Sequence, residues 1–143
     1  MRQVLILTLF AASPATAWEF TATPVCTISH ATDTAEVRVT HDPRQAEPYA
    51  IALTLTDPWT QAPVFAMAFD GAASLTISTS RHRTSPDGRT LSVSDTGFGN
   101  VLNGLEFNTT ATAISGDQAV SFPLENAAPA VQAFRACAEG GIA

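Results

Sequence analysis

Four basic residues lie within nine positions in the middle of the chain: Arg81, His82, Arg83 and Arg89. A guanidinium offers a planar fork of donors that matches a carboxylate, so the cluster can contact an anion on a small ligand or a partner protein. The alternative is a solvated end of a sheet, where arginines offset Asp87 and keep an edge strand soluble. Both interpretations stay open, and the four residues are candidate binding residues.

Trp59 is a fifth candidate for binding. It follows Asp57 and Pro58, where an expected strand ends and a loop begins. An exposed loop tryptophan can contact a ligand or a protein, because it joins a large apolar ring to an N–H donor. A tryptophan folded back onto the core is the equal alternative.

The three histidines, His30, His41 and His82, do not form a metal-binding pattern. No two of them are spaced two or four residues apart beside acidic residues, as ligands on one strand or helix would be. We expect surface or loop positions for all three. The sequence therefore predicts no metal site and no cofactor.

Motifs for catalysis are missing as well. There is no GxSxG turn for a serine nucleophile, and no motif selects two of the thirteen acidic residues as a glycosidase pair. Gly97 and Gly99 form a lone GxG without the lysine of a phosphate-binding loop. We predict a binding or accessory module without catalytic activity. The alternative is a small periplasmic hydrolase or metal-dependent enzyme whose residues meet only in space.

The two cysteines, Cys26 and Cys137, are expected to form a disulfide. Two cysteines in an exported chain most simply pair with each other. Closing so long a loop stabilises a fold by roughly 4–5 kcal/mol in the chain-entropy model. Free thiols or a metal site are the alternative, and the missing CxxC pattern disfavours them.

Export is indicated by residues 1–17. Arg2 precedes an apolar run over residues 4–12, and Ala15, Thr16 and Ala17 fit the small-x-small rule for signal peptidase. The run is shorter than the ~20 residues that a membrane span needs. We expect a signal peptide over 1–17, a single domain over 18–143, a periplasmic or secreted location, and no membrane insertion after the signal is removed.

The charge of the chain restricts its partners. The net charge is −6, and removal of Arg2 with the signal makes it −7. Such a chain does not attract a polyphosphate backbone, so nucleic-acid binding is disfavoured. The expected partner is a protein or a small anionic ligand.

Alternation of apolar and polar residues predicts a mainly β domain. Residues 64–69 are apolar on both faces, which indicates a central strand. A turn at residues 85–88 predicts a β-hairpin in which the strand 75–79, running on into 81–83, pairs with 91–93, and Asn126 is the expected N-cap of a C-terminal helix. Together these features favour an antiparallel β-sandwich of about eight strands with a short helix near 100–105. The expected strands are 18–29 (interrupted at Pro24), 34–40, 49–56, 64–69, 75–79, 91–93, 107–114 and 119–123.

Several stretches carry a resemblance to known proteins: W-E-F at 18–20, C-T-I-S at 26–29, F-D-G at 69–71, L-T-I-S-T at 75–79, G-F-G-N-V-L-N-G-L-E-F at 97–107, V-S-F-P-L at 120–124 and A-V-Q-A-F-R-A-C at 130–137. With them, the chain resembles a group of small exported alphaproteobacterial proteins of unknown function. Some of these are labelled as a component of excinuclease ABC, a label that does not suit an acidic chain without a phosphate-binding loop.

More distantly, the order of elements over residues 64–137 is similar to the invasion-associated locus B family. That resemblance implies a periplasmic β-sandwich with no known catalytic residues. Neither group has an assigned active site, so the resemblance implies no site residues here.

Overall fold

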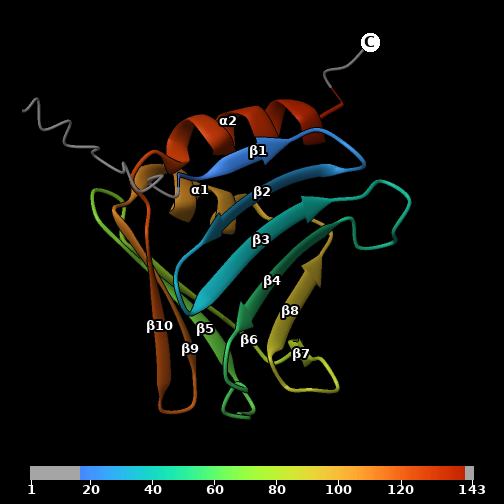
Figure 1. The fold of residues 1–143 in the computed structure, drawn as a ribbon. Helices are drawn as coiled ribbons and strands as arrows, with labels where there is room; N and C mark the ends of the chain where they lie inside the picture. Colours follow the sequence, from blue (N-terminus) through green and yellow to red (C-terminus); the bar gives the residue numbers. More distant parts are fainter. Residues whose placement is uncertain (1–16, 141–143) are drawn as a thin grey trace, which may run out of the picture.

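The computed structural model describes residues 17–140, which form two antiparallel sheets and two helices (Figure 1). The predicted signal peptide lies outside the described residues except for Ala17. The first sheet has six strands in the order β1 (Glu19–Thr21), β2 (Cys26–Ala31), β3 (Ala35–His41), β4 (Tyr49–Leu55), β8 (Thr90–Asp95) and β7 (Arg83–Thr84). The second sheet has four strands in the order β10 (Gln118–Pro123), β9 (Thr110–Ser115), β5 (Phe65–Asp70) and β6 (Leu75–Thr79).

The sandwich follows from the period-two alternation of the strands. In β4, for example, Ile51 and Leu53 are buried while Thr54 is exposed. In β5, Phe65, Met67 and Phe69 are buried between the sheets, and the strand lies between β9 and β6. The predicted central position of this strand and the predicted mainly β sandwich are both confirmed.

Some strand boundaries differ from the prediction. Residues 18–29 form two strands rather than one, because the chain reverses around Pro24 and Phe20 pairs with Ile28. The helix α1 (Gly99–Phe107) extends further than expected, so the strand predicted from residue 107 begins at Thr110. Phe107 is exposed at the end of that helix.

The predicted hairpin is confirmed only next to its turn, where Arg83 pairs with Ser92 and Thr84 with Leu91, and it is wrong for 75–79, which do not pair with 91–93. β6 pairs with β5 in the second sheet, whereas β8 pairs with β4 and β7 in the first. The turn at residues 85–88 does form, and it joins β7 to β8. Asp87 helps to hold it: the Ser85 hydroxyl donates to this carboxylate at 2.6 Å and lowers its pKa, with a further contribution from the backbone N–H of Arg89. Between β6 and β7 the chain crosses from one sheet to the other.

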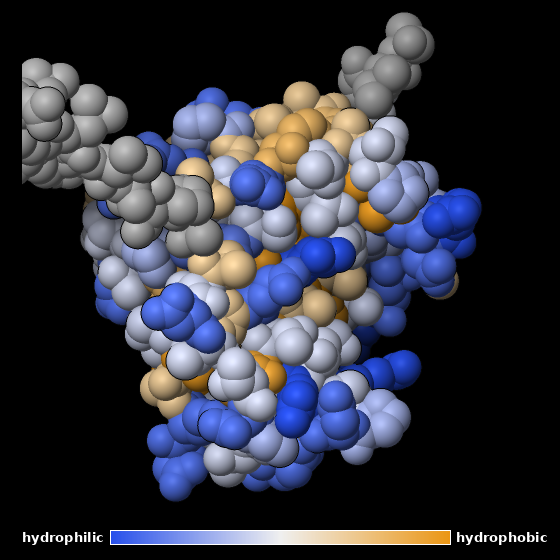
Figure 2. All heavy atoms as spheres, viewed as in Figure 1, coloured by the Kyte–Doolittle hydropathy of each residue, from blue (hydrophilic) through white to orange (hydrophobic). Residues whose placement is uncertain are grey.

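The C-terminal helix α2 (Ala127–Ala138) covers one end of the sandwich, beside β1 and β2 (Figure 1). Val131 and Phe134 on the inner face of this helix are fully buried. Hydrophobic residues gather over this helix at the top of Figure 2, while hydrophilic residues cover much of the lower half of the same view. Asn126 occupies the N-cap position, but its backbone is left-handed at φ 62° and its side chain makes no capping hydrogen bond.

The predicted Cys26–Cys137 disulfide is confirmed, with the two Cα atoms 6.0 Å apart. It joins β2 to the last turn of α2. Trp18 adds a second tie, because its indole N–H donates to the carbonyl of Pro123 at 2.9 Å. The N-terminal part of the described chain is therefore held both to the end of β10 and to α2.

Candidate functional site

A cavity of about 510 Å³ lies between the two sheets, on the side formed by β6 and β8. These two strands belong to different sheets and do not pair, so the sandwich is open there. The wall is mixed, and its apolar part is made by Ile51, Phe65, Met67, Ile77, Val93, Phe98 and Val101. Polar groups are contributed by Ser78, Thr79, Arg81, Ser94, Asp95 and Asn100.

Two cross-strand pairs form facing walls of the cavity. Ile51 of β4 pairs with Val93 of β8 in the first sheet, and Met67 of β5 pairs with Ile77 of β6 in the second. Ile51 and Met67 are buried, whereas Ile77 and Val93 are half-buried. The cavity thus has a buried apolar floor and reaches solvent along its edge strands.

The helix α1 contributes Gly99, Asn100 and Val101 to the lining. Phe98 stands at its N-cap position, makes no side-chain capping hydrogen bond, and is followed by no acidic residue in the first turn. A helix N-terminus carries a partial positive charge and free N–H groups. This part of the lining is therefore better suited to a negative or neutral polar group than to a cation.

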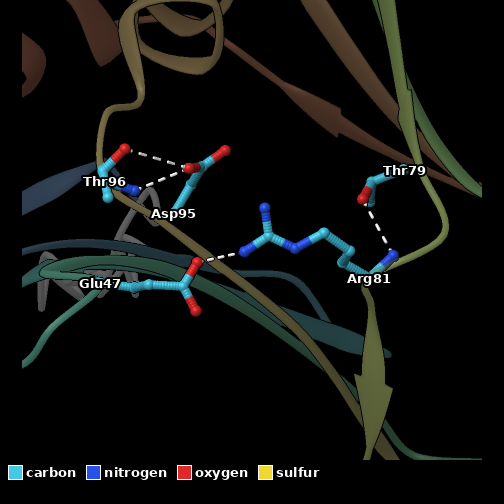
Figure 3. A network of polar contacts seen from close by, with 5 residues as sticks. All are labelled: Glu47, Thr79, Arg81, Asp95 and Thr96. Atoms are coloured by element: carbon cyan, nitrogen blue, oxygen red, sulfur yellow. Dashed lines mark hydrogen bonds and ion pairs between the residues drawn. The ribbon is translucent and has the colours of Figure 1, made fainter.

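Arg81 is the cation of the cavity lining (Figure 3). It lies in the connection between β6 and β7, where its backbone N–H donates to the Thr79 hydroxyl at 3.0 Å. Its side chain is 60% exposed and forms an ion pair with Glu47, which is 40% exposed. Asp95 lies on the same side, and its carboxylate accepts the backbone N–H of Thr96 at 2.7 Å.

The other members of the basic cluster do not line the cavity. Arg83 is exposed on β7, and Arg89 is exposed after the turn. His82 is half-buried, with Nε2 2.9 Å from the carbonyl oxygen of Ala62 and its ring centre 6.1 Å from that of Phe65. Only Arg81 of these four residues belongs to the cavity.

Trp59 is folded back onto the core, which was the second of the two predicted alternatives. It is 3% exposed, and its indole N–H donates to the carbonyl of Leu53 at 3.0 Å. Its ring meets that of Phe65 edge-on, with centres 6.2 Å apart. Trp59 thus does not line the cavity itself but packs against Phe65, which does.

The prediction of a surface or loop position is wrong for His30. This residue lies in β2, is 5% exposed, and stacks on Trp18 with ring centres 5.0 Å apart. The strand extends past residue 29, where the sequence pattern ended it, and the alternation of the pleat turns His30 inward. His41 ends β3 and lies half-buried against Tyr49. Within residues 17–140, no three His, Cys, Asp or Glu side chains gather in a way that could hold a metal ion.

Sequence reasoning missed most of the cavity. Ile51, Met67 and Val93 have the pattern of ordinary inward-facing strand residues, and Glu47 and Asp95 belong to no motif. A signal was present in residues 80–82, a short polar connection after which the chain changes sheets. Alternation alone does not report such a change, because it gives the face of a residue but not the partner of its strand.

A second, more polar hollow of about 440 Å³ is lined by Thr40, Asp42, Gln45, Glu47 and Ser94, among others. Arg44 donates to the Asp42 carboxylate from Nε at 3.0 Å, and this contact, followed by the Arg44 backbone N–H, lowers the pKa of Asp42 to about 2. Glu47 lines this hollow and forms an ion pair with Arg81, which lines the cavity. The cavity and the second hollow therefore meet at that ion pair.

We expect Arg44→Gln to raise the pKa of Asp42 from about 2 toward its ordinary value of 3.8. Because the pKa is depressed in the folded protein, the stabilisation is present above the unfolded value and is lost as the pH falls from about 4 to about 2. Carboxyl chemical shifts followed by NMR over pH 1.5–6, a range of about 4.5 units, measure the midpoint. An unchanged Asp42 midpoint in the variant would contradict the assignment, and Asp87, held by Ser85, serves as the internal control.

In residues 17–140 no helix has the length and apolar character needed to cross a membrane. No family model, curated protein or solved structure matches this chain. The resemblances drawn from the sequence therefore stay predictions, and the cavity is the basis for a functional hypothesis.

Proposed function

We propose that the protein is an exported, non-catalytic binding module whose cavity between the sheets takes a small anionic ligand with an apolar body. The observation that carries the proposal is the position of Arg81 at a cavity of about 510 Å³ whose floor is formed by apolar side chains. Cavities of roughly 300–1,000 Å³ with apolar walls and a few polar groups are typical of small-molecule sites. Medium-chain carboxylates have this combination of hydrocarbon and charge.

The walls favour the apolar part of such a ligand. Met67, Phe65 and Ile51 offer hydrocarbon surface at the floor, and burying apolar ligand surface against them contributes about 25 cal/mol per Å². No charged residue lies on these inner strand positions, so the floor has no group for a polar head to bind. The head is therefore expected at Arg81.

The polar lining favours an anion as that head. Arg81 supplies a fork of donors, and the uncapped start of α1 lines the same cavity. Asp95 opposes an anion, but the N–H of Thr96 already occupies one of its carboxylate oxygens. A small ligand is favoured over a protein contact because Arg81 is associated with a cavity and not with a flat surface.

The hydrogen bonds of the polar groups support binding rather than catalysis. The Thr79 hydroxyl accepts from the backbone of Arg81, and Nε2 of His82 faces a backbone carbonyl. Neither contact joins a nucleophile to a base, which acyl or glycosyl transfer would need. Export is supported by the Cys26–Cys137 disulfide, since such bonds persist in oxidising compartments.

Calorimetric titration with decanoate and with 1-decanol tests the proposal. We expect decanoate to bind the purified protein with a Kd on the order of 0.1 mM, given its size. Arg81→Gln should weaken decanoate binding about tenfold, because a charge-assisted hydrogen bond is lost, and should leave decanol binding unchanged. Ile77→Trp should fill the cavity and abolish the binding of both compounds.

The matched control is Arg83→Gln, which removes an exposed arginine two residues away that does not line the cavity. It should leave the decanoate affinity as it is. Equal weakening by the two arginine variants would show a general effect of charge and would count against a site at Arg81. Failure of the unmodified protein to bind either compound would refute the proposed ligand class.

A further inference from the structure

We infer that Glu47 is a built-in competitor for the anion of the ligand: it holds Arg81 in the ligand-free protein and is displaced when the ligand binds. This inference rests on the proposed function and adds a residue that sets the affinity of the cavity for anions. It starts from the one ion pair in residues 17–140 that connects the cavity to the second hollow.

The ion pair joins the two sheets at the side where the cavity opens. Glu47 lies in the loop between β3 and β4 of the first sheet, and Arg81 lies in the connection that leaves β6 of the second. Figure 3 shows the Arg81 side chain extended from this connection toward the Glu47 carboxylate. One terminal nitrogen of the guanidinium that would bind the head of a ligand is thus already paired with a carboxylate of the protein.

Asp95 is not the competitor, although it also lines the cavity. Its Oδ1 accepts the backbone N–H of Thr96 at 2.7 Å and lies 3.4 Å from the Thr96 hydroxyl. The ion pairs in residues 17–140 include Arg81 with Glu47 and not Arg81 with Asp95. Asp95 therefore does not have to leave Arg81 when a ligand binds, and its charge opposes an anion to the same extent with or without Glu47.

The pair is weak enough to be exchanged. Both side chains are substantially exposed, at 60% for Arg81 and 40% for Glu47. Exposed ion pairs change an equilibrium by only about two- to fivefold, so a ligand carboxylate can replace Glu47 with little loss. Once released, the Glu47 carboxylate still borders a hollow lined by Thr40, Gln45 and Ser94, where polar groups and water can solvate it.

Exchange of one carboxylate for another has a specific consequence. An anionic ligand must give up part of its affinity to displace Glu47, whereas a neutral ligand of the same shape leaves the Arg81–Glu47 pair intact. Glu47 thereby lowers the affinity of the cavity for anions by about two- to fivefold and leaves its affinity for neutral ligands unchanged.

The test is a double-mutant cycle between Glu47→Gln and Arg81→Gln, measured calorimetrically with decanoate and 1-decanol. We expect Glu47→Gln to tighten decanoate binding about threefold and to leave decanol binding unchanged. In the Arg81→Gln background the same substitution should have no effect on either compound. The control is Glu36→Gln, which removes an acidic residue of the first sheet that pairs with Arg38 at 2.9 Å, and which should change nothing.

Two results would overturn the inference while leaving the proposed function in place. One is an unchanged decanoate affinity in Glu47→Gln. The other is an equal gain from Glu47→Gln with and without Arg81, because Glu47 would then act only as a nearby negative charge. If no variant bound decanoate or decanol, the proposed function would be lost and this inference with it.

Discussion

Replacement of Cys26 and Cys137 together by serine is expected to lower the free energy of unfolding by about 4–5 kcal/mol. The bond joins residues 111 positions apart, so the unfolded chain without it gains the entropy of a long open loop. For a domain of this size we expect the melting temperature to fall by about 15 °C. Chemical denaturation and calorimetry of the double variant measure both quantities, and the reduced unmodified protein should match it.

Hydrogen exchange separates this effect from a general weakening of the fold. The amides of β1 and α2 should lose protection first, because the bond holds α2 to β2, next to β1. The amides of β4, β5 and β8, which carry the cavity, should remain the best protected, although their protection falls with the free energy of global unfolding. A loss of stability below about 1 kcal/mol would contradict the role given to the disulfide.

Gly104→Ala is expected to destabilise the protein by about 1–3 kcal/mol, although alanine is the better helix former by about 1 kcal/mol. Gly104 is buried in α1, and a Cβ atom there would lie 2.5 Å from the ring of Phe69. Phe69 is fully buried in β5 and has no free space to move into. The helix would have to lift off the sheet, and the cavity residues Phe98 and Val101 would move with it.

The matched control is Gly99→Ala, in the first turn of the same helix, where a Cβ atom would meet nothing within 4 Å. This variant should be neutral or slightly more stable. In the double variant Gly104→Ala with Phe69→Leu, the smaller side chain should relieve the clash, so the combined loss should be less than the sum of the single losses. A stabilising Gly104→Ala, in line with Gly99→Ala, would show that Phe69 does not confine the helix.

The fold class was predictable because it depends on local patterns. Alternation over β3 and β4 reports strands with one buried face, and Val131 and Phe134 mark the buried face of a helix. The disulfide was predictable from a count of two cysteines. The signal peptide and the family resemblance stay predictions.

The partition of strands between sheets was not predictable in the same way. β6 and β8 have the pattern of a hairpin, and apart from the short polar connection at residues 80–82 nothing local in residues 75–95 indicates that they pair with β5 and β4 instead. The cavity depends on that partition, since it lies where these two strands part. Arg81 was a candidate from the sequence because of its charge. Glu47 was not, because only the fold shows that it lies next to Arg81.

The contact between the first and last described elements has a consequence for the order of folding. Trp18 binds the carbonyl of Pro123, 105 residues away, and Cys26 reaches Cys137. Because a chain is synthesised from its N-terminus, the residues of β1 and β2 are present long before those of α2, which cover them. These early strands must therefore stay uncovered while the remaining strands assemble, and contacts of such long sequence separation form slowly. The packing of α2 against β1 and β2 is therefore a late step of folding, and the domain is complete only after it.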